Sequence, residues 1–363
     1  MTSVQETTDS KDTVSRHGLA NVGNSCYLNS AFQALRSTKL FMDYFGTDAW
    51  TRHRHEDRRG FELAGHVAEL VSALKAPGDN CVNPLNFARA FVKVAHEFNE
   101  DIRPGVQADG AEAIQILLDA LHTQQAREVN MKISGTAATA DQAELIKSLE
   151  SWTTFFRKEY SPIIDSFFGQ TQKKVICDTC RTCSTTYEPW GVFKVPIPGA
   201  EKAGAPAPTL QECIAAALAP EKMDDYYCNT CAKKGPATIN LSISKFPKQL
   251  ILSIKRFINS GAKVRCRVPY DVDAVCLNDC RAWPSIQGSL TYRVTSTVEH
   301  LGGSRGGHYI MRSRDLATGK PEKPEKPEKP DEWYIYDDSR VSLCTAGGTA
   351  TPDTYVLFLE PCL

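Results

Sequence analysis

The sequence lacks a large net charge, a long apolar run and a secretory leader. Its 42 basic and 43 acidic residues give a formal net charge of −1 at pH 7, so neither a nucleic acid nor a membrane surface is an expected partner. No apolar run approaches the ~18 residues that a membrane-spanning helix needs. Residues 1–16 are polar and have no apolar core of the kind found in signal peptides, so we expect a disordered leader.

The cysteine content points to chemistry inside the cell rather than to a disulfide framework. Thirteen cysteines without a secretory signal favour reduced thiols, metal ligands or a catalytic thiol, and a cytosolic or nuclear location. The 363 residues are 42% apolar and 23% charged, which is typical of a globular protein with room for two or three subdomains.

Residues 18–30, GLANVGNSCYLNS, place Cys26 at the start of a predicted helix. One apolar helix face follows it, at Leu28, Ala31, Phe32 and Leu35. Asn24 or Ser25 would be the N-cap. The positive end of the helix dipole would then lower the pKa of the Cys26 thiol and favour the nucleophilic thiolate. A buried structural cysteine at a helix start explains this stretch alone equally well.

Two later stretches supply a possible base and acid for such a nucleophile. Residues 302–310, GGSRGGHYI, carry His308 after a glycine pair, and residues 333–342, WYIYDDSRVS, carry Asp337 and Asp338. A cysteine, a distant histidine and a later acid are the parts of a thiol-protease triad. Strand alternation would turn the two adjacent carboxylates to opposite faces, so only one of them can orient the imidazole.

These motifs resemble the ubiquitin-specific proteases, a papain-like family of deubiquitinating cysteine peptidases. The stretch around Cys26 is similar to the family's Cys box, and the stretches around His308 and Asp337 are similar to its His box. The resemblance covers the chain from about residue 17 to its end. It implies an α+β fold with a helical thumb at about 17–160, zinc-bearing β fingers within 165–245 and a β-rich palm in the remainder.

The resemblance also implies a role for each residue of the reaction. Cys26 is the nucleophile and His308 the general base, in preference to His300, which matches an earlier histidine of the family and suits a structural role. The first acid of the pair, Asp337, orients His308. For Asp338, on the opposite face of the strand, we expect a position nearer the oxyanion side or a backbone amine and a contribution through water.

Asn21 completes the expected catalytic set. A side-chain amide five residues before Cys26 can donate to the tetrahedral oxyanion, together with a backbone N–H near the sulfur. The family uses the matching asparagine in this way. A turn-forming asparagine is the alternative.

The expected substrate-binding residues come from two stretches. Residues 107–121 resemble a box of the family that lies beside the channel for the C-terminal tail of ubiquitin, and Gln107, Asp109 and Glu112 are retained from it. The expected substrate contacts are those of the two acidic residues. The resemblance implies that these carboxylates pair with basic residues of that tail. A substrate ending in Gly-Gly needs a narrow channel, which favours a contribution from Gly306, Gly307 and Tyr309, because glycine lets two backbones approach closely.

Two CxxC pairs predict a metal site, formed by Cys177, Cys180, Cys228 and Cys231. Two such turns let four thiolates converge tetrahedrally on one Zn²⁺, and four cysteines leave no open position, so the zinc would be structural. The separation of the pairs is longer than in a compact zinc ribbon, and four reduced thiols without metal are the alternative. The family carries a similar pair of turns at the tip of its fingers.

Local signals predict the remaining elements. Apolar periodicity indicates helices over 61–75, from Asn83-Pro84 onward and over 107–121. We expect Asn83 to cap its helix with Pro84 as the first helical residue. Asp141 and Glu144 form a possible capping box for another helix. From Ser161 onward the period changes toward strands, among them 290–300, which reads as a half-buried strand.

A low-complexity insertion occupies 317–332, with KPEKPEKPEKPD at 320–331. Proline favours an extended course without hydrogen-bond donors, so we expect an exposed tether outside the core. A docking segment for a proline-recognising partner is the alternative.

The sequence therefore predicts a deubiquitinating thiol protease that hydrolyses isopeptide, peptide or thioester bonds at the C-terminal glycine of ubiquitin. Its partners would be ubiquitin and ubiquitinated proteins, with an activating protein partner left open. Two other classes remain: a protease for another ubiquitin-like modifier, and a ubiquitin-binding scaffold without catalysis.

Overall fold

The computed structural model describes residues 16–53, 55, 62–78, 80–200, 206–258, 260–285, 290–304, 306–314 and 332–362. The leader, except Arg16, and the KPE repeat lie outside these residues. The helices are α1 Cys26–Arg36, α2 Lys39–Phe45, the 3-10 helix η1 Asp48–His53, α3 Glu62–Lys75, α4 Leu85–Phe98, α5 Gly110–Gln125, α6 Ala140–Phe156, α7 Pro162–Phe167, α8 Leu210–Ala217 and the 3-10 helix η2 Asn278–Cys280. Among the described helices, none is both long and apolar enough to cross a membrane.

The strands form two sheets, which confirms the predicted α+β class. A four-stranded antiparallel sheet has the order β2 Cys183–Trp190, β1 Gly169–Cys177, β5 Lys233–Lys245, β4 Glu221–Cys228. An eight-stranded sheet has the order β11 Arg340–Leu343, β10 Trp333–Asp337, β9 Gly306–Arg314, β8 Thr291–Gly303, β12 Thr354–Pro361, β6 Leu250–Lys255, β3 Phe193–Pro196, and β7 Val275–Cys276 pairs with β8.

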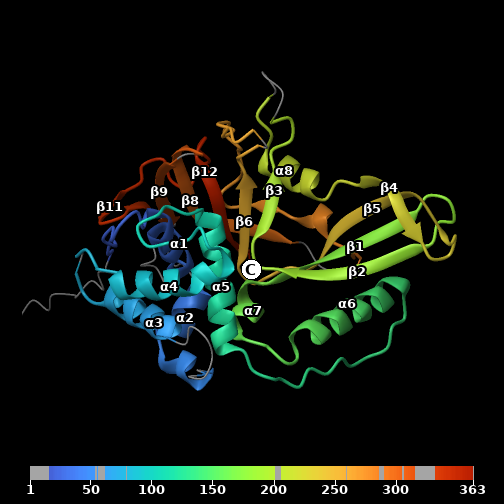
Figure 1. Cartoon of the computed structure of the whole chain (residues 1–363), viewed down its shortest axis with the longest axis horizontal. Coiled ribbons are helices and arrows are strands. Elements are labelled where there is room, and N and C mark those ends of the chain that lie inside the picture. The colour runs from blue at the N-terminus through green and yellow to red at the C-terminus, as the bar shows by residue number, and fades with distance from the viewer. Residues whose placement is uncertain are drawn as a thin grey trace, which may run out of the picture.

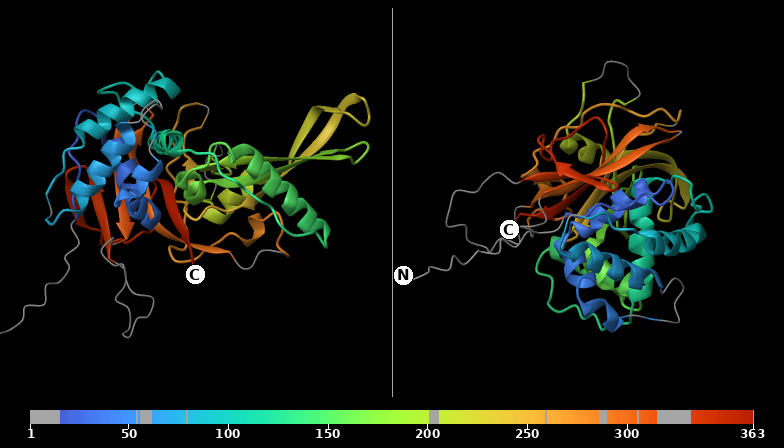
Figure 2. Two further views of the ribbon diagram at one scale, coloured as in Figure 1. Left: turned by 90° about the horizontal axis from the view of Figure 1, so that it is seen from below. Right: turned by 90° about the vertical axis from the view of Figure 1, so that its left-hand side faces the viewer.

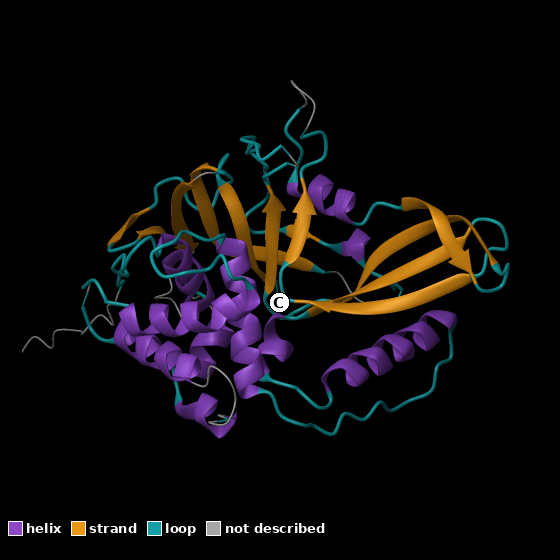
Figure 3. Cartoon of the chain, in the orientation of Figure 1, coloured by secondary structure: helices purple, strands orange, loops and turns teal. Residues whose placement is uncertain are grey.

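Helices α1 to α5 gather beside the eight-stranded sheet, and the four-stranded sheet extends away from both (Figures 1 and 3). Figure 2 shows this extension from a second direction. Helix α6 lies along the four-stranded sheet, where the Lys174 ammonium pairs with the Glu144 carboxylate at 2.8 Å. The Tyr187 hydroxyl donates to the Glu144 carbonyl at 3.1 Å. The chain therefore has a helical part, a large sheet and a projecting small sheet.

The eight-stranded sheet is buried on both faces, because helices and loops cover each side. Alternation along β12 shows this directly: Val356 and Phe358 belong to the apolar cluster that includes α1 to α5, while Leu357 and Leu359 belong to a second cluster with α8. A strand covered on both faces reads as a continuous apolar run.

Helix α1 is buried along its whole length, from Cys26 to Arg36. It lies between α5 on one side and β8 and β9 on the other. The Phe32 ring sits at its centre, 4.8 Å from the Phe87 ring and 6.1 Å from the Phe41 ring between centroids. The apolar face predicted after Cys26 is thus confirmed, and the polar side of the helix is enclosed as well.

Several local predictions need correction at element ends. Helix α4 begins at Leu85, and Asn83 accepts from its backbone N–H without being the N-cap. The capping box of α6 uses Thr139 and Gln142, two residues before the predicted pair, because a threonine with a glutamine at N3 forms the same reciprocal bonds.

The change toward strands does not occur at Ser161. The Ser161 side chain caps a short helix, α7, with Pro162 at its first position, and strands begin only at Gly169. The predicted half-buried strand 290–300 is also deeper than expected: Glu299 is enclosed and pairs with the Arg312 guanidinium at 3.1 Å.

Candidate active site

Cys26 occupies the first turn of α1, held by a loop of polar residues. Ser25 is the N-cap residue, but its side chain makes no cap hydrogen bond and instead accepts from the Val22 N–H at 2.9 Å. The Asn24 side chain donates to the Gly105 carbonyl at 2.7 Å, and its backbone has φ of 52°. The prediction of Ser25 as an N-cap residue is confirmed, but neither candidate side chain caps the helix, because both are used to shape the loop.

Burial dominates the chemistry of the thiol. The Cys26 side chain is 1% exposed. This burial raises the pKa of the Cys26 thiol, and the nearby Asp338 carboxylate raises it further, while the Tyr309 N–H and the Gln107 amide act in the opposite direction. The expected lowering of this pKa by the helix end is wrong in its net direction. The raised pKa favours the neutral thiol over the thiolate.

His308 and Asp337 lie side by side on neighbouring strands. The β9 and β10 strands pair antiparallel, with Tyr336 opposite Met311. This register brings His308 Nε2 within 2.6 Å of the Asp337 carboxylate. The hydrogen bond orients the ring and leaves its Nδ1 as the nitrogen that can accept a proton.

Asp338 turns to a different set of partners. Its backbone has φ of 48°, in the left-handed region, because it begins the turn between β10 and β11. Its carboxylate accepts from the Asn21 amide at 2.9 Å and from the Asn29 amide at 2.7 Å. The two adjacent carboxylates therefore bind different groups. Asp337 binds the imidazole of His308, and Asp338 binds Asn21 in the loop before Cys26, together with Asn29.

Both the nitrogen and the oxygen of the Asn21 side-chain amide are hydrogen-bonded. Its nitrogen donates to Asp338, and its oxygen accepts from the N–H groups of Gly23 and Ser25, each at 3.2 Å. A side chain with both ends bonded cannot flip without losing these contacts. The arrangement leaves one amide hydrogen of Asn21 for another acceptor.

Gln107 contacts the Cys26 sulfur, a contact that the sequence did not predict. Its amide nitrogen lies 3.6 Å from Cys26 Sγ and 2.5 Å from the Gly307 carbonyl. Its amide oxygen accepts from the Gly307 N–H at 3.2 Å. The signal that could have found it is its place in the stretch that resembles the family box. Gln107 ties the start of α5 to β9 beside the sulfur.

The predicted substrate-binding carboxylates are bonded inside the protein. Asp109 caps α5 by accepting from the N–H groups of Ala111 and Glu112, and it also accepts from the Tyr355 hydroxyl at 2.5 Å. Glu112 accepts from the Asn99 amide at 2.9 Å. These contacts give Asp109 a structural role, since its two oxygens hold α5 against β12.

The predicted channel residues divide between surface and core. Gly306 is exposed and has φ of +148°. Tyr309 is buried, and its ring lies 4.5 Å from the His300 ring and against Gly110, where a Cβ would come within 2.9 Å of Tyr309 Cε1. The glycine at position 110 thus makes room for the Tyr309 ring.

His300 is enclosed away from solvent. Burial lowers the pKa of this histidine, and the Lys263 charge lowers it further. Its ring packs against Phe257 as well as Tyr309. A neutral, packed imidazole of this kind fits the structural interpretation that the sequence favoured.

The four cysteines of the two CxxC pairs meet at the far end of the four-stranded sheet. The sulfurs of Cys177 and Cys231 are 3.9 Å apart, and those of Cys180 and Cys228 are 3.5 Å apart. Four sulfurs bound at ~2.3 Å to one tetrahedral zinc ion would lie about 3.8 Å from each other, so the cluster fits a metal ion. All four ligand atoms lie within 4.8 Å of one another.

The two turns of this cluster have the same backbone shape. The residue after the second cysteine of each pair, Arg181 and Ala232, has a left-handed conformation with φ of 62° and 51°. Cys183, the next thiol along the chain, is exposed and lies outside the cluster.

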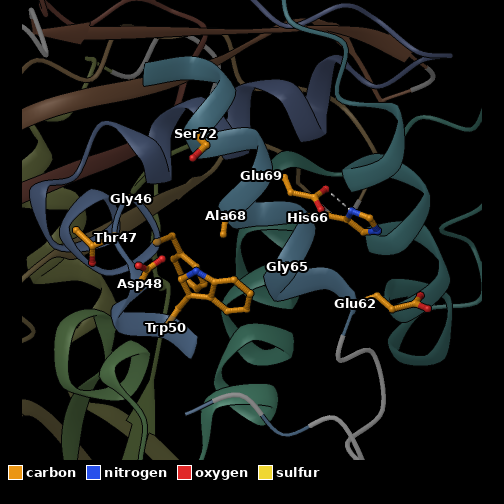
Figure 4. A pocket seen from close by; sticks show the side chains of 11 residues that line it. Gly46, Thr47, Asp48, Trp50, Glu62, Gly65, His66, Ala68, Glu69 and Ser72 are labelled. Atoms are coloured by element: carbon orange, nitrogen blue, oxygen red, sulfur yellow. Dashed lines mark hydrogen bonds and ion pairs between the residues drawn. The ribbon is translucent and has the colours of Figure 1, made fainter. Parts of the chain in front are cut away.

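A groove of about 840 Å³ lies elsewhere on the helical part, between α2, η1 and α3 (Figure 4). Trp50 lines it, and Asp48, Glu62 and Glu69 stand around it, with Glu69 paired to His66 at 2.9 Å. The lining includes no residue of the candidate active site.

Comparison with known proteins gives a consistent family. The model of the family described as ubiquitin carboxyl-terminal hydrolase matches residues 17–359. Ubiquitin carboxyl-terminal hydrolase 2 of Bos taurus is 28% identical over 364 residues, covering 98% of this chain and 57% of its own length. Ubiquitin carboxyl-terminal hydrolase 21 of Mus musculus is 27% identical, covering 94% of this chain and 61% of its own length. The chain thus spans less than two thirds of these relatives.

Solved structures share the fold. A SAGA Ubp8/Sgf11/Sus1/Sgf73 DUB module bound to ubiquitin aldehyde contains a chain that matches with a TM-score of 0.69 and 17% identity, over 96% of this chain and 70% of that one. A related module bound to monoubiquitin matches with a TM-score of 0.67 and 18% identity, over 96% and 69% of the two chains.

The hairpin beside His308 predicts a sharp contrast between two glycines. A Cβ at Gly307 would collide with the Leu301 carbonyl and come within 2.5 Å of His300 Nε2, whereas a Cβ at Gly303 meets nothing within 4 Å. We expect Gly307→Ala to lower the free energy of unfolding by about 1–3 kcal/mol, because β8 and β9 must separate. Gly303→Ala is the matched control and should stay within about 0.5 kcal/mol. Equal losses in urea unfolding would contradict this packing.

Proposed function

The chain belongs to the ubiquitin carboxyl-terminal hydrolase family, and we propose that it is a deubiquitinating thiol protease that hydrolyses bonds at the C-terminal glycine of ubiquitin. The observation that carries this proposal is the position of the Cys26 sulfur against β9. The sulfur meets the Gln107 amide and the N–H of Tyr309, the residue after His308, and His308 is itself bonded to Asp337. A nucleophile, a base and an orienting acid at one place support acyl transfer.

The proposed reaction begins with proton removal. Because burial raises the pKa of Cys26, His308 acts as a general base on the thiol. Asp337 holds the ring through its 2.6 Å bond and stabilises the imidazolium that forms. The sulfur then attacks the carbonyl carbon of the terminal glycine.

The second part of the reaction releases the two products. The free amide hydrogen of Asn21 donates to the tetrahedral oxyanion, since Asp338 occupies only one of its two hydrogens. His308 returns its proton to the leaving amine, which gives a thioester. Water activated by His308 then hydrolyses the thioester and frees ubiquitin.

Two other functions make different predictions. A protease for another ubiquitin-like modifier would react with the electrophilic form of that modifier and not with electrophilic ubiquitin. A binding scaffold would react with neither. Solved relatives bound to ubiquitin aldehyde and to monoubiquitin favour ubiquitin, so we expect covalent labelling by C-terminally electrophilic ubiquitin.

We also propose that the four-cysteine cluster holds a structural Zn²⁺. Sulfur separations of 3.5 and 3.9 Å and the lack of any non-cysteine donor in the set support zinc. Bound zinc would join the β1–β2 turn to the β4–β5 turn, so it would stiffen the tip of the four-stranded sheet. The zinc ion would therefore be structural and would take no part in the reaction at Cys26.

We further propose the subdomain limits and location given by the sequence: thumb at about 17–160, fingers within 165–245, palm in the remainder, and a cytosolic or nuclear protein. The end of α6 at Phe156 and the span of the four-stranded sheet from Gly169 to Lys245 support the limits. The high cysteine content, with four of the thirteen gathered as candidate metal ligands, supports a reducing compartment.

Replacing the nucleophile should separate turnover from binding. Cys26→Ala should lower kcat for a fluorogenic ubiquitin reporter by at least about 10⁴-fold, because no thioester can form, while Kd for ubiquitin changes less than about threefold. Cys276→Ser, at an exposed cysteine, is the control and should keep full activity. Turnover of Cys26→Ala near that of the wild type would place the nucleophile elsewhere.

Metal analysis tests the cluster. We expect about one zinc per chain in the purified protein, and Cys228→Ser should lose that zinc and lower Tm, because binding of a structural metal is coupled to folding. Cys183→Ser, outside the cluster, should retain both zinc and Tm. Absence of zinc from the native protein would refute this assignment.

Single substitutions of the two adjacent acids separate their roles. Asp337→Ala should lower kcat by about 10³-fold or more, because the imidazole loses its orienting partner, and Asp337→Asn should lose less. Asp338→Ala should cost about 10–100-fold, through the loop that carries Asn21. If Asp338→Ala costs far more in kcat than Asp337→Ala, the assignment of the orienting acid is wrong.

A further inference from the structure

We propose that Asn29 is a positioning residue: it holds Asp338, and through Asp338 the Asn21 amide, in the geometry that the reaction needs. This inference rests on the proposed function, since it concerns the same site. Asn29 belongs to the stretch that resembles the Cys box, but none of the roles derived so far includes its side chain.

Asn29 lies three residues after Cys26 on α1, so the two side chains leave the same side of the helix. Its side chain is enclosed, with 3% exposure. An amide buried to this degree must donate its hydrogen bonds to protein acceptors, because little water can reach it. The acceptors around the Asn29 amide therefore indicate which groups it positions.

The Asn29 nitrogen faces three acceptors from two segments. It lies 2.7 Å from the Asp338 carboxylate, 3.2 Å from the Ala20 carbonyl and 3.4 Å from the Leu19 carbonyl. The shortest contact is with the charged group, as expected for a charge-assisted hydrogen bond. One amide thus joins the β10–β11 turn to the loop that precedes the nucleophile.

The same two segments are joined by backbone contacts. The Leu19 N–H donates to the Asp338 carbonyl at 2.8 Å. Gly18 lies so close to Ser339 that a Cβ there would collide with the Ser339 carbonyl. These contacts fix the position of the turn, while the Asn29 amide fixes the direction of the Asp338 carboxylate.

The direction of that carboxylate decides how the Asn21 amide is presented. Asp338 gives one oxygen to Asn29 and the other to Asn21, so the two asparagines lie on either side of it. With the first hydrogen of Asn21 bound to Asp338, the second has a defined direction. Without Asn29, one carboxylate oxygen would lose its partner, and Asp338 could rotate away from Asn21.

Other side chains at position 29 cannot reproduce this arrangement. Alanine removes the donor and leaves the Asp338 oxygen and two carbonyls without it. Aspartate sets a second carboxylate against Asp338 and two carbonyl oxygens, which is repulsive. We therefore expect the order of activity to be wild type, then Asn29→Ala, then Asn29→Asp.

The experiment is a double-mutant cycle on the full chain, with kcat and KM measured on a fluorogenic ubiquitin reporter. Asn29→Ala should lower kcat by about 10-fold or more with KM changed less than about threefold, because a misplaced donor weakens the transition state. Asn29→Ala combined with Asp338→Ala should be no slower than Asp338→Ala alone, because both changes break one chain of contacts.

A matched variant separates positioning from a general loss of helix stability. Gln33 is also enclosed on α1, but its amide donates to the His17 carbonyl and not to Asp338. Gln33→Ala should lower Tm to a similar extent while kcat changes less than about threefold. If Asn29→Ala does not fold, Asn29→Ser provides the same cycle, because the serine hydroxyl can bond to a backbone carbonyl of its own helix but is too short to reach Asp338.

Each outcome bears on the proposal. Losses in kcat that multiply for Asn29→Ala and Asp338→Ala would overturn it, because they would show independent roles. Equal kcat losses for Asn29→Ala and Gln33→Ala would show that Asn29 acts only by stabilising the helix, and not by positioning Asp338. A wild-type protein that neither turns over the reporter nor reacts with electrophilic ubiquitin would instead remove the proposed function, which is a distinguishable result.

Discussion

The enclosure of α1 is the constraint on which the rest of the structure depends. A helix buried on all sides has to satisfy every polar group it carries, and its first turn carries the thiol. The helices α3, α4 and α5 cover one side and the large sheet covers the other. The sulfur therefore lies at the seam between the two, where a residue from either side can reach it.

Polar contacts at that seam come from segments far apart in the chain. Gln107 contacts the Cys26 sulfur from the segment before α5, and the Asp338 carboxylate lies near it from the β10–β11 turn, where Asn21 and Asn29 hold it. Gln107 is fixed in turn by Gly307. Geometry of this kind is preorganised, because no side chain has to be reoriented when charge develops. The left-handed turn at Asp338 is what lets two consecutive acids serve two different groups.

Short motifs with a strict chemical pattern were the most predictable parts of the chain. The CxxC pairs could be assigned to one cluster from the spacing within each pair together with the family resemblance, and the apolar face after Cys26 could be assigned to the core from its periodicity. The direction of the Cys26 pKa shift could not be predicted, since it depends on burial by distant elements. The contacts of Gln107 and Asn29 could not be predicted either, because their partners, Gly307 and Asp338, lie far away in the sequence.

The Gln107 amide occupies both the N–H and the carbonyl of Gly307, which is how a neighbouring strand would pair with that residue. An extended peptide laid along the same backbone would find these groups already taken. Its arrival would exchange hydrogen bonds rather than add them, so the exchange itself would contribute little net affinity. Most of the binding free energy for a protein substrate would then have to come from surfaces remote from its tail, and a short tail peptide alone would bind weakly.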